Sequence, residues 1–480
     1  MSAMPRLKVL SDEEVSTIYN NCVAYLVKKG VKVEHPKALK ILDGAGAHVD
    51  FTNQQVRFPK DMIEAALKSV PSSMLLAGSD PRHDTILPDP NGSFHVWAST
   101  GCRWVVEPVT NIYHEVTMAD MAEYGQMIEA LDNIDHGAFL TATDRPNETY
   151  DIHAMKAMLE NTSKHLNLQP HTFESIEYLI ELAIAVAGSS ESLKKRPIIH
   201  IFSGSVAPFA FKPMDIEIII QSCNYGLPLE VQSLTCMGAT SPITIAGNVT
   251  QLAIDNLAQL VMSQIFRPGT PVKAAGGGST LDMATGRMMA ANAITIIGSA
   301  ATMQFHKDAF HIPVSSAPFG TDAFVPDGQA MMEVALKGLM IALTGADMLS
   351  LAGRLCSGKA VSYIKLILDD TVASILKRIV RGVKVDEDTL AWKEIQDMNP
   401  AGNYLELAHT LKHCHDALYP ELLPGISYDN WLKEGSKDLT ARAVDKYREL
   451  KKTMKPLELP KEVQNELNRI VKHADEHLVK

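Results

Sequence analysis

The sequence predicts an α/β protein built on a (β/α)8 barrel of the TIM type, with a mixed helical region before the barrel and a helical extension after it. Short apolar runs alternate with amphipathic helical segments through the middle of the chain, as in parallel sheets whose strands are joined by helices. Eight such runs can be counted, and eight βα units indicate closure into a barrel. A large doubly wound sheet would also alternate in this way. It should carry a clear phosphate-binding fingerprint, and we find none in the required strand–helix context.

The first segment, residues 1–90, reads as a mixed helical region. Ser11 is followed directly by acidic residues, a pattern that indicates the start of a helix. A helix, a short strand pair and a second helix follow. The region then ends at a group of prolines, Pro81, Pro88 and Pro90.

The barrel is expected over residues 91–383. A polar, helical stretch over residues 384–480 is expected to form an extension that packs on the barrel. The eight predicted strands cover residues 94–99, 137–142, 164–170, 197–203, 228–234, 271–277, 312–317 and 348–353.

Composition excludes several classes of protein. The net charge is -11, from 45 basic and 56 acidic residues, which argues against nucleic acid as a partner. The six cysteines are widely spaced and form no C-x-x-C pair, so we expect a reduced, cytoplasmic protein. The opening residues lack the apolar core of a signal peptide, and no apolar run is a convincing membrane span. The abundant apolar helices favour a homo-oligomer.

Five segments, in order, resemble the trimethylamine methyltransferase superfamily. The most specific is residues 237–272, with a Gly-Ala-Thr-x-Pro-x-Thr-x-Ala-Gly block, a helix and a Pro-Gly-x-Pro-Val strand entry. The likeness runs through most of the chain, which makes the resemblance stronger than any one motif. The other four segments are residues 30–51, 101–121, 281–286 and 321–330.

The resemblance implies a (β/α)8 barrel that moves a methyl group from an amine to the Co(I) corrinoid of a partner protein. The founding trimethylamine enzymes of that superfamily contain pyrrolysine, whereas this sequence contains only the twenty standard residues. Members without pyrrolysine are associated with quaternary amines such as glycine betaine, proline betaine and carnitine. We therefore expect a quaternary amine, with glycine betaine favoured, and a corrinoid carried by a cognate protein.

A trimethylammonium group is attracted to aromatic faces, each favourable contact contributing about 0.5–2 kcal/mol. Active sites of such barrels lie at the C-terminal ends of the strands, so aromatic residues there are the candidates. Trp97 follows this rule on the first strand and Phe202 on the fourth, while Phe319 and Phe324 lie in the loop after the seventh. Each of the four could instead pack in the core or under the loop.

A betaine carboxylate requires hydrogen-bond donors or a cation. Gln169 and His171 flank the end of the third strand, and Gln232 lies at the end of the fifth. Arg354 directly follows the eighth strand and is the preferred carboxylate anchor, with a salt bridge at the barrel rim as the alternative.

Candidate corrinoid contacts lie after the sixth and seventh strands. Gly276, Gly277 and Gly278 allow close approach of the backbone to a flat ring. Asp322 either orders its loop or meets the partner protein.

Two alternative functions stay open. A zinc-dependent methyltransferase for an alcohol or thiol would use cysteines such as Cys102, Cys236 and Cys356, which we instead expect to be buried small residues. No tightly bound metal is therefore expected. A protein that binds betaine without catalysis is the other alternative.

Overall fold

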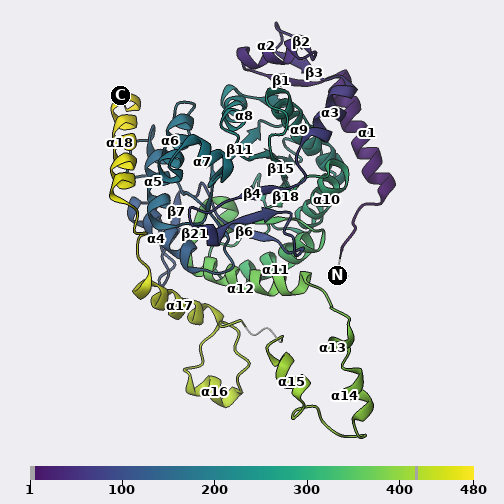
Figure 1. The fold of residues 1–480 in the computed structure, drawn as a ribbon, viewed down its shortest axis with the longest axis vertical. Coiled ribbons are helices and arrows are strands. Elements are labelled where there is room, and N and C mark those ends of the chain that lie inside the picture. The colour runs from purple at the N-terminus through teal and green to yellow at the C-terminus, as the bar shows by residue number, and fades with distance from the viewer. Residues whose placement is uncertain (1–5, 417–419, 480) are drawn as a thin grey trace.

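The computed structural model describes residues 6–416 and 420–479. Residues 1–5, 417–419 and 480, which belong to the predicted terminal regions, lie outside the described residues. Eight parallel strands form a closed barrel in which each strand pairs with its neighbours (Figure 1). This confirms the predicted fold class. The barrel strands, in their order around the wall, are β6 (His95–Ala98), β9 (His136–Ala138), β10 (His165–Leu168), β11 (Ile199–Ser205), β13 (Leu229–Ser233), β15 (Val272–Ala275), β18 (Val314–Ser316) and β19 (Met348–Ala352).

Each barrel strand is followed by a helix that packs outside the wall. Most strand residues are buried, as expected for a parallel sheet covered on the outside by helices and filled on the inside by side chains. The helices are α4 (Met118–Ala130), α5 (Tyr150–Asn161), α6 (Ser175–Ala187) with the short α7 (Ser190–Lys195), α8 (Pro213–Tyr225), α9 (Ile245–Phe266), α10 (Ala293–Phe310), α11 (Gly328–Leu343) and α12 (Tyr363–Val380).

The segment before the barrel covers one flank and closes the N-terminal end of the barrel. Ser11 caps the first helix, α1, with a capping box in which Ser11 and Glu14 each bond the other's backbone N–H. The hairpin of β4 and β5 plugs the barrel floor, because its Met74 and Leu87 pack against Trp97 and Met348. The elements of this segment are α1 (Asp12–Lys28), β1 (Val31–Val33), α2 (Pro36–Gly44), β2 (His48–Asp50), β3 (Gln55–Arg57), α3 (Lys60–Ser69), β4 (Met74–Leu76) and β5 (Thr85–Leu87).

Short strands in the loops form three-stranded and four-stranded sheets after the C-terminal ends of the barrel strands. A further short strand, β12 (Ala210–Phe211), joins β1–β3 in a separate four-stranded sheet. The loops thus contribute ordered backbone around the end of the barrel where the candidate residues were expected. The strands of the first two sheets are β14 (Cys236–Met237), β16 (Ser279–Leu281) and β17 (Met288–Met289), and β7 (Trp104–Val106), β8 (Tyr113–Glu115), β20 (Arg354–Leu355) and β21 (Ala360–Ser362).

The chain beyond the barrel first extends away from the barrel and then packs against its outer helices. Helices α13–α16 extend away from the body and contribute no buried residue, whereas α17 and α18 pack on it (Figure 1). The elements are α13 (Glu387–Leu390), α14 (Trp392–Asp397), α15 (Ala408–His413), α16 (Tyr428–Lys433), α17 (Leu439–Thr453) and α18 (Lys461–Leu478).

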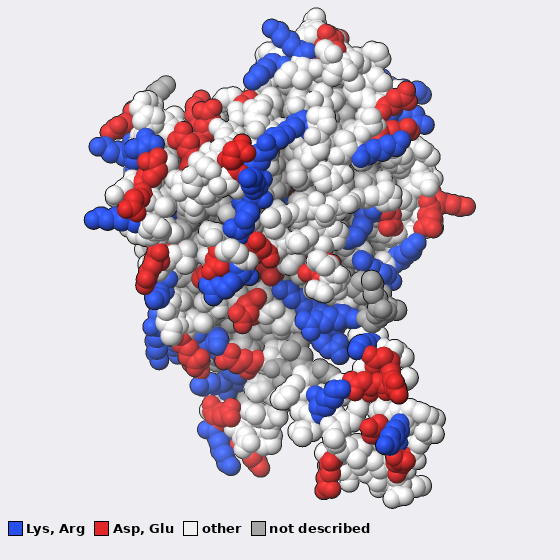
Figure 2. Space-filling model, viewed as in Figure 1, with Lys and Arg blue, Asp and Glu red and all other residues white. Residues whose placement is uncertain are grey.

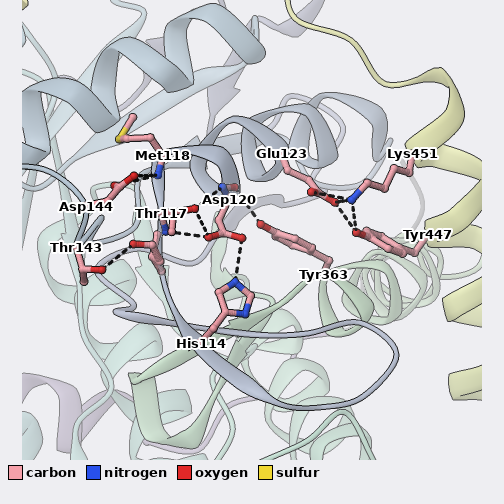
Figure 3. Close-up of polar contacts among 11 residues, drawn as sticks. His114, Thr117, Met118, Asp120, Glu123, Thr143, Asp144, Tyr363, Tyr447 and Lys451 are labelled. Carbon is pink, nitrogen blue, oxygen red and sulfur yellow. Dashed lines mark hydrogen bonds and ion pairs between the residues drawn. The ribbon is translucent and has the colours of Figure 1, made fainter.

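A polar contact fixes α17 to the barrel helices (Figure 3). The Glu123 carboxylate of α4 accepts a hydrogen bond from the Tyr447 hydroxyl at 2.5 Å and forms an ion pair with Lys451 at 3.0 Å. The Tyr447 ring stacks on Tyr363 of α12, with centroids 6.1 Å apart. The helix therefore rests on both α4 and α12.

The surface carries both signs of charge. On the face drawn in Figure 2, lysine and arginine side chains are interspersed with aspartate and glutamate. Within the described residues, none of the helices has the length and apolar character needed to cross a membrane.

Candidate functional site at the C-terminal end of the barrel

A cavity of about 340 Å³ opens among the strand ends and the loops that follow them. Every barrel strand except β9 contributes to its wall, so residues distant in sequence meet there. The cavity is of the size that holds a small organic ligand. The wall includes at least one residue from each of these seven strands: Trp97, Asn167, Phe202, Glu230, Ala275, Ser315 and Ser350.

The aromatic part of the wall consists of Trp97 and Phe202. Trp97 is 5% exposed, and its ring centroid lies 5.7 Å from the Lys273 ammonium nitrogen. An edge of the same indole system meets the His200 ring at a centroid distance of 6.4 Å. Trp97 is therefore held rigidly by its neighbours while it faces the cavity, which suits a cation-binding surface.

A buried ion pair lies at the floor of the cavity. Glu230 of β13 and Lys273 of β15 are partners in the strand register, and the Lys273 ammonium directly contacts the Glu230 carboxylate. Both side chains are almost fully buried, and Glu230 lines the cavity. Burial lowers the pKa of Lys273, while the neighbouring carboxylate opposes that shift. The pair is neutral overall, which reduces the cost of keeping the Glu230 charge beside the cavity.

Two cationic side chains line another part of the wall. Arg354 of β20 is partly exposed, and one of its terminal guanidinium nitrogens donates to the Gly358 carbonyl at 3.2 Å. Lys337 of α11 donates to the Ala290 carbonyl at 2.7 Å. Burial lowers the Lys337 pKa to about 8, with Asp322 opposing the shift. The two cations make this part of the cavity attractive to an anion.

Several buried polar atoms on cavity-lining residues have no hydrogen-bond partner within the described part of the chain. A buried donor or acceptor left unpaired costs free energy, about 1–3 kcal/mol for a typical group. A polar ligand in this cavity would supply the missing partners. These atoms are Trp97 Nε1, Asn167 Oδ1, Thr235 Oγ1, Ser315 Oγ and Arg354 Nε.

The three glycines after β15 all line the cavity. A side chain at Gly276 would meet Leu252 of α9 at 2.8 Å, and one at Gly277 would meet the Ser299 hydroxyl of α10 at 2.7 Å. Gly278 has a φ of +75°, a conformation that favours glycine. Close packing against two helices therefore requires glycine here, and without side chains the backbone itself lines the cavity.

The structure thus brings together most of the residues predicted from the sequence. The predicted residues that line the cavity are Trp97, Gln169, Phe202, Gln232, Gly276, Gly277, Gly278 and Arg354.

Four predicted residues are not among the lining residues of this cavity. His171 is exposed and its ring packs against Tyr150, with centroids 4.8 Å apart. Phe319 is fully buried under its loop, and Phe324 is 54% exposed, with the Arg287 guanidinium 5.0 Å from its ring centroid.

Asp322 is the fourth residue outside the cavity lining. Its carboxylate accepts hydrogen bonds from the backbone N–H groups of Ala290 and Ala291, each at 3.0 Å, and from the Ser357 hydroxyl at 2.6 Å. These contacts tie the loop after β18 to the segment before α10. The geometry fits the loop-ordering role considered for Asp322.

Asn167, Glu230 and Lys337 line the cavity but were not anticipated from the sequence. Asn167 and Glu230 are polar residues inside apolar strands, a pattern that could have revealed them, because a buried polar group requires a partner. Lys337 carries no such signal, because lysine is common on helix surfaces.

The cysteines considered for zinc are only partly as expected. Cys102 is buried, but Cys236 and Cys356 are partly exposed rather than buried, because both lie in the loops at the mouth of the barrel. Among the described residues, no group of three or more His, Cys, Asp and Glu side chains is placed to hold a metal ion.

Comparisons with known proteins add a functional class. The model of a family described as trimethylamine methyltransferase (MTTB) matches residues 1–478. A trimethylamine methyltransferase of Desulfitobacterium hafniense (strain DSM 10664 / DCB-2) is 30% identical over 484 residues, covering 97% of this chain and 94% of that protein. A glycine betaine methyltransferase of Desulfitobacterium hafniense (strain Y51) is 25% identical, covering 90% of each chain.

The fold is also similar to a solved structure. The crystal structure of the monomethylamine methyltransferase of Methanosarcina barkeri superposes with a TM-score of 0.51 at 10% identity, covering 98% of this chain and 89% of that one. At this identity the likeness concerns the fold alone.

Proposed function

Because this chain belongs to the trimethylamine methyltransferase family, we propose that it removes a methyl group from a quaternary amine that carries a carboxylate. Glycine betaine is the favoured donor, and the acceptor is the Co(I) corrinoid of a cognate partner protein. The chain is a methyltransferase by family, so the proposal concerns the donor and the acceptor.

The observation that carries the choice of donor is the distribution of charge around the cavity. Arg354 and Lys337 line the wall, whereas the acid on the floor, Glu230, is already neutralised by Lys273. Among the charged side chains that line the cavity, the two cations therefore outnumber the single acid. A lone cation such as trimethylammonium gains little there, while the carboxylate of a zwitterion compensates the two cations.

The cationic end of the same ligand has its own surroundings. Trp97 and Phe202 offer aromatic surface, and Glu230 and Asn167 offer oxygen atoms in the floor. In the wall, β15 and β18 separate the strand of Glu230 from β19, the strand that leads into Arg354. A zwitterion that reaches from Glu230 to Arg354 would place its ammonium group beside the aromatic rings and its carboxylate beside the cations. This favours a betaine over a simple amine.

The reaction requires little acid–base catalysis from the protein. Co(I) supplies the nucleophile and donates the electron pair that forms the new C–Co bond, becoming Co(III). The C–N bond breaks, and its electron pair stays on nitrogen as a neutral tertiary amine, so no proton has to be supplied. The side chains of this cavity bind, orient and dehydrate the ammonium group so that one methyl faces the acceptor.

We also propose roles for two groups of residues near the corrinoid acceptor. The backbone at Gly276, Gly277 and Gly278, which lines the cavity, would allow a flat ring to approach closely. Asp322 would act indirectly, by ordering the loop after β18.

The reaction can be tested with the purified protein, Co(I) cobalamin and one donor at a time: glycine betaine, proline betaine or carnitine. We expect glycine betaine to yield methyl-Co(III), with dimethylglycine formed mole for mole. Failure with all three donors, repeated with a cognate corrinoid protein, would refute the proposal. Tight binding of betaine without methyl transfer would instead favour a protein that only binds this ligand.

A further inference from the structure

The floor of the cavity contains an amide whose orientation can be worked out. Asn167 of β10 is 1% exposed and lines the cavity. Its side-chain nitrogen Nδ2 lies 2.5 Å from Nε2 of His200. Its oxygen Oδ1 has no hydrogen-bond partner among the described residues. Whether the oxygen or the NH2 group serves the ligand depends on which nitrogen of His200 carries its proton.

Two buried histidines connect this amide to the barrel floor. His200 Nδ1 lies 2.8 Å from His165 Nε2, and His165 Nδ1 lies 2.9 Å from the Ala77 carbonyl oxygen. The two ring planes are inclined by only 12° with centroids 5.1 Å apart, so this contact joins the rings edge to edge, and both side chains are fully buried. Ala77 directly follows β4, so the chain of contacts begins at the hairpin that plugs the barrel.

The direction of each hydrogen bond in this series, from the Ala77 carbonyl through His165 and His200 to Asn167, follows from the bond to Ala77. A carbonyl oxygen only accepts, so His165 Nδ1 must carry a hydrogen. Burial lowers the pKa of His165 to about 3 and that of His200 well below 6.5, so both rings are neutral at pH 7. His165 Nε2 is then an acceptor, and His200 must donate to it from Nδ1. His200 Nε2 is left as an acceptor, which requires the NH2 group of Asn167 to face it.

We propose that His165 and His200 act as positioning residues that fix the amide of Asn167, so that its carbonyl oxygen serves the cationic end of the substrate. Asn167 is then a specificity-determining residue, and this inference rests on the proposed quaternary amine donor. Methyl groups next to a cationic nitrogen carry partial positive charge and make favourable C–H···O contacts with such an oxygen. The reversed amide would present an NH2 group and repel the ammonium.

Among the described residues, few charged or titratable groups lie beside His165 and His200. Glu230 Oε2 lies 3.6 Å from His200 Nε2, and Lys273 directly contacts the same carboxylate. The His136 ring lies 5.2 Å from that of His165. A His200 protonated on both nitrogens would pair with Glu230 and reverse the amide of Asn167. The protonation state of His200 therefore decides between the two orientations.

Nuclear magnetic resonance of the full-length protein labelled with ¹⁵N-histidine reads these protons directly. We expect His165 and His200 to be neutral at pH 7 with the hydrogen on Nδ1, their signals being assigned by their loss in the His165→Leu and His200→Leu proteins. Either histidine with its hydrogen on Nε2, or charged, would overturn the inference. This measurement needs no substrate, so its outcome is independent of the proposed function.

The consequence for binding is tested with two ligands of the same shape. Glycine betaine and 3,3-dimethylbutanoate differ in that a cationic nitrogen in the first is a carbon in the second. We expect Asn167→Leu to lower the ratio of their affinities about tenfold, by weakening betaine alone. His165→Leu should lower the ratio in the same direction, although residue 165 is not a cavity-lining residue.

The control is His306→Leu, which removes another fully buried histidine, on α10 and outside the chain of contacts. It should leave the ratio unchanged. An unchanged ratio in Asn167→Leu, or an equal loss for both ligands, would overturn the role of Asn167. If the wild-type protein binds no betaine, the proposed function fails and this role fails with it, while the NMR result still reports on the histidines.

Discussion

Replacing Arg354 by methionine should weaken glycine betaine binding and leave tetramethylammonium binding unchanged. Arg354 lines the cavity, its Nε has no partner within the described residues, and one terminal nitrogen bonds the Gly358 carbonyl. Hydrogen bonds to a charged group contribute about 1.5–3 kcal/mol. Because Arg354 is partly exposed, solvent screens the interaction and the lower half of this range applies. The expected loss of affinity is therefore about ten- to fortyfold.

The assay is isothermal titration calorimetry with three ligands. Glycine betaine carries both charges, 3,3-dimethylbutanoate keeps only the carboxylate, and tetramethylammonium keeps only the cation. The first two should lose affinity by the same factor in Arg354→Met. Arg287→Met serves as the matched control, because Arg287 lies near the same loops without lining the cavity. Equal losses for all three ligands, or a loss for tetramethylammonium alone, would refute the role of Arg354 as carboxylate anchor.

Three further predictions follow from the same geometry. Betaine affinity should fall as the pH rises through about 8, where Lys337 loses its proton, because the ligand has no group that titrates there; titrations over this pH range should show no such step in Lys337→Met. Trp97→Leu should weaken tetramethylammonium and betaine alike by about fivefold, the loss of about 1 kcal/mol of cation–π attraction, with unchanged affinity counting against Trp97 as a cation-binding surface. Burial lowers the pKa of both His165 and His306 to about 3, so below pH 6.5 the unfolded chain binds protons that the folded chain does not. The free energy of unfolding should therefore fall between pH 6.5 and 3, by at most about 1.4 kcal/mol per pH unit for each histidine, and denaturant titrations of His306→Leu should show a shallower fall.

The barrel was predictable because its strands are short apolar runs followed by helices. All eight predicted runs overlap the observed barrel strands, although β9 spans only His136–Ala138 and β11 continues to Ser205. The position of Arg354 just after a strand was enough to place it at the mouth of the cavity, because barrel loops converge at that end.

Contacts between strands could not be read from the sequence. Glu230 and Lys273 lie 43 positions apart and become partners only through the register of β13 with β15. The direction in which a loop side chain points could not be read from the sequence either. Phe319 was expected near the ligand because its loop follows a strand, but the loop turns this ring into the core and leaves Phe324 outside. Hydrophobic burial explains the placement of Phe319, and it depends on neighbours that are distant in sequence.

The most direct measurement is the initial rate of methyl-Co(III) formation from Co(I) cobalamin with glycine betaine and, in a parallel reaction, with trimethylamine at the same concentration. A carboxylate-bearing quaternary amine as donor predicts that glycine betaine reacts, that trimethylamine reacts far more slowly or not at all, and that Arg354→Met reduces the difference. Rapid methylation from trimethylamine with none from glycine betaine would contradict the proposed donor and the roles assigned to Arg354 and Lys337.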